Sequence, residues 1–195
     1  QLYASTPSTQ AGNPNAVIRV NPASAAVSAA VFVGSEPTDV AVSDDGTTLW
    51  VGLLGAGAVR GVDLATMTAG TSFSLGYDPD RGQRLPGQLI VLPGHPQTVV
   101  VTRHFAGTTA PGGVAIFDEG VQRPDTISSY SIYVTDLVAT YSDRLVYGFN
   151  GYHTEFGLHT LCVDHRGLTL IDTLRSFVSS FSSHLSFDDS VIYAS

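Results

Sequence analysis

The chain has 195 residues, enough to bury a sizeable core and slightly more than a typical single domain. Hydrophobic residues make up 43% of it and charged residues only 13%, which argues against a disordered tail. The net charge of −8 disfavours a broad nucleic-acid-binding surface, and no apolar run approaches the roughly 18 residues of a membrane span.

Short segments with strand composition recur along the chain. One series is rich in aliphatic and aromatic residues, with starts 46 to 50 residues apart, at Leu2, Leu49, Val99, Leu145 and Ile192. A second series lies between these and ends on Asn21, Asp63, Asp118 and Asp164. A third series precedes each later member of the first, over 39–46, 88–94, 135–139 and 184–189. Bounding Gly, Pro, Asp and Ser residues predict that each segment is a strand between turns.

A weaker fourth strand is expected after each Asn or Asp, over 27–33, 71–75, about 125–130 and 168–173. Four strands in every 45 to 50 residues or so are typical of one β-propeller blade. We therefore predict an all-β chain, a β-propeller arc of about four blades of four antiparallel strands. A β-sandwich would not repeat the same series four times, and a parallel β-helix has shorter coils.

The predicted domain is a single partial propeller that covers residues 1–195. Its expected blades are about 1–34 (without an innermost strand), 36–76, 86–131, 132–175 and the start of a fifth over 182–195. Closed rings of this blade type usually hold about six to eight blades. We therefore expect the chain to be part of a longer ring of six to eight blades, with a dimer of half-rings as the alternative.

One repeat resembles a known family. The sequence DVAVSDDGTTLWVG over 39–52, followed by GAVRGVD over 57–63, is similar to the YVTN-type β-propeller repeat of bacteria. The resemblance is sharp over 36–66, and LPGHP over 92–96 departs from it. It implies a secreted or cell-envelope propeller with an extracellular, cell-surface or periplasmic location. Some relatives are lactonases or quinone-dependent enzymes, so the resemblance implies a ring rather than a reaction.

Loop lengths predict which face of the propeller binds. Connections between first and second strands are short, over 43–47, 92–97, 140–144 and 187–190. Longer connections emerge on the opposite face, over 5–15, 76–86, 103–113 and 149–157. Binding residues are often carried on loops held by a rigid scaffold, so the long-loop face is the predicted binding surface.

The candidate ligand-binding residues on this face are Arg81, Arg84, Arg103, His104, Tyr152, His153 and Glu155. The guanidinium fork of an arginine suits a carboxylate or an acidic sugar. The alternative is that these are solvated loop arginines, paired with neighbouring Asp78 and Asp80. Tyr77 lies in the same loop.

No catalytic constellation, metal site or cofactor is predicted. His153, Glu155 and His159 are ligand types for zinc, but their spacing along an extended strand separates them, and polar loop residues with His159 at a strand edge are expected instead. The single Cys162 excludes an internal disulfide and is expected to be a buried thiol in a strand. Trp50 is expected to pack between blades.

The leading hypothesis is a non-catalytic secreted or cell-envelope domain that recognises a protein or glycan partner through the long-loop face. One alternative is a lactonase-like or quinoprotein-type enzyme with a central-channel site near Arg81, Arg103, His104 and His153. The other alternative is a purely structural module of a multidomain surface protein.

Overall fold

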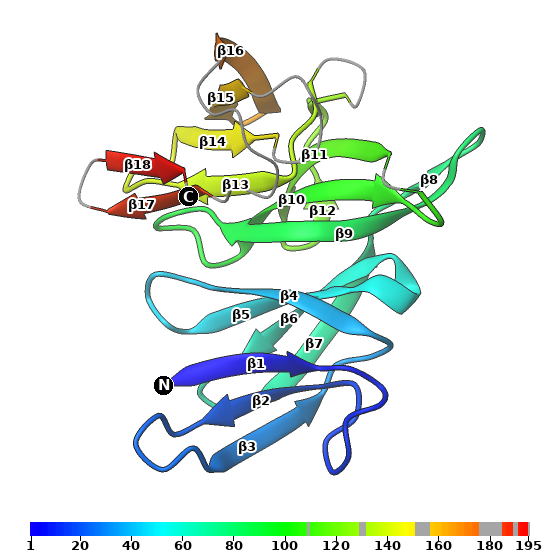
Figure 1. The fold of residues 1–195 in the computed structure, drawn as a ribbon, viewed down its shortest axis with the longest axis vertical. Coiled ribbons are helices and arrows are strands. Elements are labelled where there is room, and N and C mark those ends of the chain that lie inside the picture. The colour runs from blue at the N-terminus through cyan, green and yellow to red at the C-terminus, as the bar shows by residue number, and fades with distance from the viewer. Residues whose placement is uncertain (109, 129–131, 151–156, 176–184, 189–190, 195) are drawn as a thin grey trace.

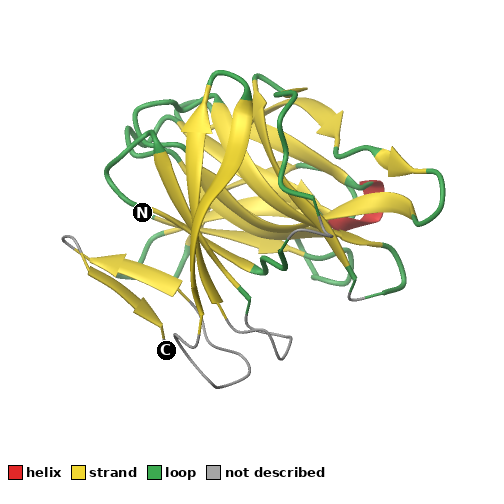
Figure 2. Cartoon of the chain, turned by 90° about the horizontal axis from the view of Figure 1, so that it is seen from above, coloured by secondary structure: helices red, strands yellow, loops and turns green. Residues whose placement is uncertain are grey.

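The computed structural model describes residues 1–108, 110–128, 132–150, 157–175, 185–188 and 191–194. Within these residues the chain is all-β, apart from one short helical turn, η1 (Leu54–Ala56) (Figure 2). The strands form five antiparallel sheets that follow one another in chain order (Figure 1), and we call them blades 1 to 5. Within each sheet, consecutive strands of the chain are neighbours.

The strands have the following bounds. Blade 1 holds β1 (Leu2–Thr6), β2 (Ala16–Val20) and β3 (Val27–Phe32), and blade 2 holds β4 (Pro37–Val42), β5 (Thr48–Leu53), β6 (Ala58–Asp63) and β7 (Thr68–Ser74). Blade 3 holds β8 (Tyr77–Asp78), β9 (Gly82–Val91), β10 (Thr98–Phe105), β11 (Pro111–Asp118) and β12 (Val121–Gln122). Blade 4 holds β13 (Asp136–Ala139), β14 (Leu145–Phe149), β15 (Gly157–Asp164) and β16 (Gly167–Arg175), and blade 5 holds β17 (Leu185–Asp188) and β18 (Val191–Ala194).

The blades stack through their first strands, so the chain is an arc of a β-propeller, as the repeat predicts. In blade 3 we count β9 as the first strand, because the two-residue β8 only forms a hairpin with it; β4 contacts β9, β9 contacts β13, and β13 contacts β17. Figure 1 shows β4, β9 and β13 at successively higher levels above blade 1, with β17 of blade 5 on the left beside β13. The short β4–β5 and β9–β10 turns lie on the left of that view, and the β8–β9 hairpin projects on the right.

The hydrophobic core lies between blades. Strand β10 shows why its sequence is a continuous run of valines, since Val99 and Val101 pack toward blade 2 while Val100 packs toward blade 4. Side chains alternate between the two faces of a strand, so a strand that is covered on both faces has no polar face. Trp50 and Leu89 belong to the cluster between blades 2 and 3, which confirms the expected inter-blade packing of Trp50.

A tight turn closes β4 onto β5, as the Asp- and Gly-rich sequence predicts. Asp45 Oδ1 accepts hydrogen bonds from the Ser43 hydroxyl (2.6 Å) and the Thr47 backbone N–H (3.0 Å). Gly46 has a φ of +69°, a conformation that glycine adopts at little cost. The acidic residues of this turn therefore have a structural role.

Blade 3 departs from the prediction at both ends. The expected loop over 76–86 is instead a hairpin of β8 and β9, in which Tyr77 pairs with Gln83. The outermost strand is β12, earlier than the expected 125–130; the described residues of that range form two isolated bridges, Val114–Ile127 and Asp125–Gly167, and 129–130 lie outside the described residues. The turn Glu119–Gly120 is short enough to start the outer strand earlier than the composition suggested.

Candidate functional site

The β8–β9 hairpin brings two of the predicted site arginines, Arg81 and Arg84, to the long-loop end of blades 2 and 3. Its turn is fixed by Asp78, whose Oδ1 accepts 3.1 Å hydrogen bonds from the backbone N–H groups of Asp80 and Arg81. Arg84 Nη2 donates to Asp78 Oδ2 at 3.1 Å. This is the pairing with Asp78 that the sequence offered as the alternative for Arg84, although Arg84 lies in strand β9 and not in a solvated loop.

Phe105 lies beneath two of these guanidinium groups. Arg84 and Phe105 are cross-strand partners in the β9–β10 pair, so their side chains can meet on one face of the sheet. The Cζ atoms of Arg81 and Arg84 lie 5.4 and 5.6 Å from the centroid of the Phe105 ring. At these distances the two guanidinium groups make cation–π interactions with the ring, and these interactions hold the hairpin against the end of β10.

Gln83 attaches the hairpin to the neighbouring loops. Its Nε2 donates a 2.7 Å hydrogen bond to the Ala56 carbonyl in η1 of blade 2. Its own carbonyl accepts a 3.3 Å bond from the Ala106 N–H in the β10–β11 connection. Loops of two successive blades are thereby joined through one residue, so the hairpin is held at both blades.

Arg103 and His104 lie inside β10, whereas the sequence predicted them in a loop. Arg103 is only 6% exposed, and its Nη1 donates to Gln122 Oε1 at 3.0 Å and more weakly to the Leu75 carbonyl at 3.4 Å. Burial, and to a lesser degree the charge of Arg84, lowers the pKa of Arg103 to about 10. Arg103 is therefore part of the blade 2–blade 3 interface rather than of an open ligand surface.

His104 is half-buried, and burial lowers the pKa of its imidazole below the ordinary value. Tyr77 is 70% exposed on the hairpin. The other predicted site residues, Tyr152, His153 and Glu155, lie outside the described residues, so the structure does not place them.

The histidine expected at a strand edge is interior. His159 lies in β15, which is paired with β14 on one side and β16 on the other. It is buried, and its Nδ1 lies 3.0 Å from the Thr173 hydroxyl. Burial, with a smaller contribution from Arg175, lowers its pKa. The described part of the chain contains no group of three His, Cys, Asp or Glu side chains that could hold a metal ion.

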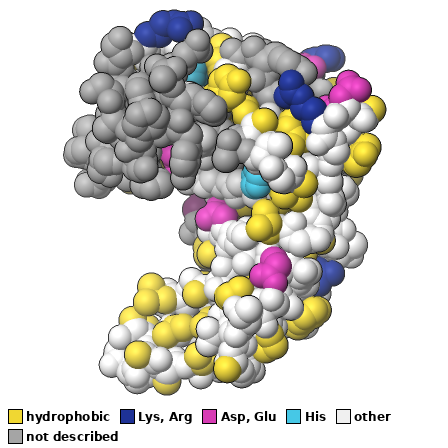
Figure 3. Space-filling view, turned by 45° about the vertical axis from the view of Figure 1, so that its right-hand side comes forward, with side chains coloured by type: hydrophobic (Ala, Val, Ile, Leu, Met, Phe, Trp, Pro, Cys, Tyr) yellow, Lys and Arg dark blue, Asp and Glu magenta, His cyan; other side chains and the backbone are white. Residues whose placement is uncertain are grey.

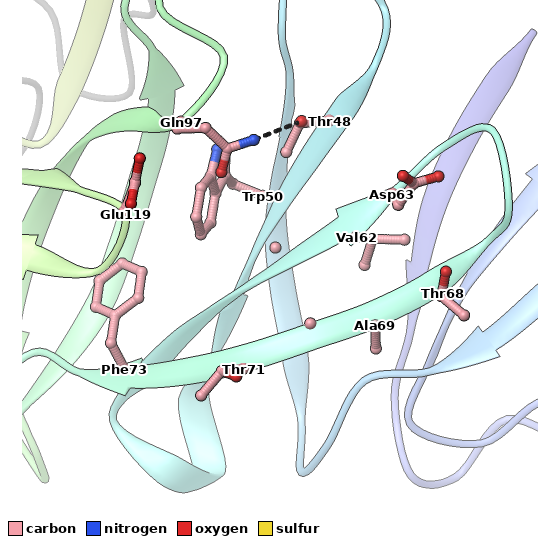
Figure 4. Close-up of a pocket in the computed structure, with 12 residues that line it drawn as sticks. Thr48, Trp50, Val62, Asp63, Thr68, Ala69, Thr71, Phe73, Gln97 and Glu119 are labelled. Carbon is pink, nitrogen blue, oxygen red and sulfur yellow. Dashed lines mark hydrogen bonds between the residues drawn. The ribbon is translucent and has the colours of Figure 1, made fainter.

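A cavity of about 460 Å³ opens between blades 2 and 3 on the short-turn face (Figure 4). Aromatic, acidic and neutral polar side chains line it: Trp50, Phe73, Asp63, Glu119, Thr48 and Gln97. The rings of Trp50 and Phe73 meet edge to face, with centroids 5.8 Å apart. Gln97 Nε2 donates to the Thr48 hydroxyl at 3.2 Å, and Trp50 Nε1 donates to the Pro96 carbonyl at 2.9 Å.

A second cavity, of about 470 Å³, is lined by residues of blades 3 and 4 near their short turns. Its lining includes both charge signs and the half-buried thiol of Cys162, which was expected to be fully buried. His95 Nε2 lies 3.4 Å from Asp143 Oδ2 across its mouth, and Arg123 forms part of the wall. Among the described residues, both cavities thus open on the face where the sequence predicted only tight turns.

Sequence reasoning missed these cavity residues because it ranked loops by length. A usable signal was present in the repeat, since Gly61 and Gly70 stand in adjacent strands of blade 2 where side chains would otherwise fill the gap between blades. Glycines within strands leave space that a side chain would otherwise fill, and on that basis Gly61 and Gly70 would have predicted this cavity.

Blade 1 presents a different kind of surface. Leu2, Val27 and Phe32 are exposed, with Phe32 at 64%. In Figure 3, the lower end of the molecule shows yellow hydrophobic side chains among uncoloured atoms and no charged group.

Comparison with known proteins supports the fold and leaves the family open. No family model matches the sequence, and the search of curated proteins found no similar sequence. The solved β-propeller domain of Cps50 (Swd1) from Myceliophteria thermophila is similar, with a TM-score of 0.66 and 13% identity over 88% of this chain and 52% of that one.

Two further solved structures are similar at 13% identity and a TM-score of 0.60. The WD40 repeats of RRP9 match over 80% of this chain and 44% of that one, and U3-55K matches over 80% and 45%. This chain therefore spans about half the length of the propellers that it resembles. These similarities establish the propeller fold, and the resemblance to the YVTN-type repeat stays a prediction.

Proposed function

We propose that this propeller arc is a protein-binding domain whose docking element is the β8–β9 hairpin. The observation that carries the proposal is Tyr77, which is 70% exposed on a hairpin whose turn is fixed by the Arg84–Asp78 ion pair. Tyrosine and arginine are enriched among the residues that dominate binding energy at protein interfaces. An exposed tyrosine on a rigid support loses little conformational entropy when a partner covers it.

The surroundings of the hairpin support the same reading. Gln83 joins it to η1 and to the β10–β11 connection, so the hairpin and its neighbours form one continuous surface. Arg81 and Arg84 add cationic groups that are held over Phe105. Pre-organised aromatic and guanidinium groups suit a protein partner with an apolar patch and a nearby carboxylate.

The finer features predicted from the sequence remain part of this proposal. They are a secreted or cell-envelope location and recognition of a protein or glycan partner, of which we propose the protein. Within the described residues, no helix is long and apolar enough to cross a membrane. Of the residues expected near a channel in the enzyme alternative, Arg103 is buried against Gln122 and the Leu75 carbonyl, and His153 lies outside the described residues.

The test compares two exposed tyrosines on opposite faces. Tyr77→Ala removes the ring on the hairpin, and Tyr141→Ala removes an equally exposed ring (78%) on the short-turn face. Proteins captured on the wild-type chain are identified and purified, and their Kd values for both variants are measured. We expect Tyr77→Ala to weaken binding about tenfold or more and Tyr141→Ala to leave it unchanged.

A larger loss of affinity for Tyr141→Ala than for Tyr77→Ala would contradict the proposal. Enzymatic removal of glycans from the captured partner separates the two partner classes. Binding that survives deglycosylation is binding to protein, whereas complete loss of binding would replace the protein partner with a glycan.

A further inference from the structure

Blades 2 and 3 share a register that allows their positions to be matched one to one. In blade 2, Thr48 pairs with Asp63 across β5 and β6. In blade 3, Thr98 pairs with Asp118 across β10 and β11 in the same place. Two residues further along the paired strands, the pair Trp50–Gly61 of blade 2 corresponds to the pair Val100–Ile116 of blade 3. The matched residues lie on the face that each blade turns toward its successor.

In blade 3, an arginine occupies the place beside this pair. The backbone N–H of Arg123 donates to the Ile116 carbonyl at 2.9 Å, which puts Arg123 opposite Ile116. Its Nε and Nη2 donate to the two carboxylate oxygens of Asp118 at 2.7 and 2.8 Å. Its Nη1 reaches the Asp164 carbonyl of blade 4 at 2.6 Å. One guanidinium therefore links blades 3 and 4.

In blade 2, the equivalent place holds glycine. The β6–β7 pairing runs from Val62–Ala69 to Arg60–Ser72 with a bulge between them, so Gly70 and Thr71 together lie opposite Gly61, and Gly70 is the residue two places after Thr68, as Arg123 is two places after Val121. Both glycines line the 460 Å³ cavity. A Cβ on Gly70 would meet only the Gly61 carbonyl, at 3.5 Å, so the absence of a side chain there is not forced by crowding.

The groups around the cavity suit a cation with a flat face. Asp63, the counterpart of the Asp118 that holds Arg123, lines the cavity together with Glu119. Arginine and histidine are absent from its described lining, and the sequence contains no lysine. Hydrogen bonds from Thr66 hold the pKa of Asp63 below its ordinary value, so its carboxylate is charged at neutral pH. The Trp50 and Phe73 rings, which lie with Glu119 at the other end of the cavity from Asp63 (Figure 4), supply an aromatic surface for the rest of an arginine side chain.

We infer that the cavity between blades 2 and 3 binds the guanidinium group of an arginine side chain presented by a partner protein. Arg123 shows that the same backbone frame holds a guanidinium through a terminal Asp carboxylate in the next blade. The cavity opens on the short-turn face, away from the β8–β9 hairpin, so this site is separate from the proposed docking element.

The probe is a short blocked peptide, acetyl-Gly-Arg-Gly-amide, and its control is the same peptide with citrulline, which has the shape of arginine without its charge. Trp50 is the only tryptophan of the chain, so its fluorescence and its indole N–H signal in NMR report on this cavity alone. We expect a saturable change at Trp50 with the arginine peptide, about tenfold weaker with citrulline, and weaker with added salt.

Two variants locate the binding. Gly70→Arg supplies the chain with its own guanidinium and should abolish peptide binding, whereas the matched control Gly70→Ala should retain it. Gly70→Arg should also melt a few degrees above Gly70→Ala, because it recreates the arrangement of Arg123. The double variant Asp63→Asn with Glu119→Gln should bind about tenfold more weakly, and asparagine still offers Thr66 an acceptor.

Equal responses to arginine and citrulline, no response at Trp50, or a response to a neutral sugar in place of the peptide would overturn the inference. So would unchanged binding by the double variant, which decides the question if Gly70→Arg does not fold. Tyr77→Ala should bind the peptide normally, so failure of this site and failure of the hairpin proposal are distinguishable.

Discussion

The Asp39 carboxylate accepts a 2.6 Å hydrogen bond from the backbone N–H of Leu89, which joins the first strand of blade 2 to the first strand of blade 3. The next pair of blades repeats the contact with a neutral group, since the Gln88 amide oxygen accepts from the Leu137 N–H. Burial raises the pKa of Asp39 above its ordinary value despite this hydrogen bond. The hydrogen bond that the Asp39 side chain accepts therefore stabilises the contact between blades 2 and 3, whereas the negative charge of Asp39 does not.

We predict that Asp39→Asn keeps or raises the free energy of unfolding, by up to about 1 kcal/mol, whereas Asp39→Ala lowers it by about 1–2 kcal/mol by leaving the Leu89 N–H without its acceptor. Because the folded-state pKa of Asp39 is raised, the folded chain binds its proton more tightly than the unfolded chain. Stability is then lost as pH rises from the unfolded pKa through the folded one.

Chemical denaturation of the wild type and Asp39→Asn at a series of pH values measures this effect. The free energy of unfolding of Asp39→Asn relative to wild type should rise with pH above pH 4 or so, because residue 39 loses a proton only in the wild type. An advantage that shrinks as pH rises would show that the Asp39 charge stabilises the fold.

A second prediction concerns Gly167, where blades 3 and 4 are joined by backbone. Its φ is +139°, and a Cβ there would lie 1.9 Å from the Asp125 carbonyl oxygen, which accepts a 3.0 Å bond from the Leu168 N–H. Gly82 also has a positive φ, +91°, but nothing lies within 4 Å of its Cβ position. Gly167→Ala should cost about 3 kcal/mol or more, and Gly82→Ala about 1 kcal/mol. Equal losses in denaturant unfolding would refute this link between the blades.

A further prediction concerns the contribution of the buried Arg103 charge to the stability of the blade 2–blade 3 interface. Its described hydrogen-bond acceptors are neutral, Gln122 Oε1 and the Leu75 carbonyl, and burial lowers its pKa to about 10. Arg103→Met keeps most of the volume and removes the cost of burying the charge, so stability should stay within about 1 kcal/mol of wild type or rise. A loss of several kcal/mol in urea unfolding would show that the guanidinium is essential to the interface.

Arg123 and Arg166 form a matched pair of arginines at the blade 3–blade 4 junction. Arg123 holds both oxygens of Asp118 and a carbonyl of blade 4, whereas Arg166 pairs with Asp125 at the surface with its side chain 60% exposed. Arg123→Met should lower stability by about 1–2 kcal/mol, whereas Arg166→Met should have a clearly smaller effect because water screens its exposed ion pair.

The pH dependence of Arg123→Met has a defined sign. The hydrogen bond from Arg123 holds the pKa of Asp118 below its ordinary value, so this stabilisation is present above the unfolded pKa and is lost as pH falls through the folded one. Between neutral pH and pH 3 or so, Arg123→Met should therefore lose less stability than wild type. Parallel curves for the two proteins would contradict this role.

Much of the fold could be predicted because strands that are buried between blades must consist of apolar residues, and these strands recur along the sequence. The strand beginning at Val99 has to be apolar on both faces to fit between two blades, and that requirement makes it visible in the sequence. The turn over 43–47 was equally readable, since Asp45 and Gly46 have the properties that such a turn needs.

The candidate site was harder to predict, because it depends on contacts between blades. Nothing local shows that Arg103 continues a strand, since its neighbours also suit a loop, and its burial is set by Gln122 and Leu75 from other strands. The hairpin of Tyr77 was hidden because β8 has only two residues, too few for a periodic pattern.

Hydrogen–deuterium exchange of the chain alone and in complex with its purified protein partner tests the central functional claim most directly. The account predicts slower exchange on binding in residues 77–84, which form the hairpin and its support. Protection confined to the short turns at 43–47 and 92–97, with residues 77–84 unchanged, would contradict it.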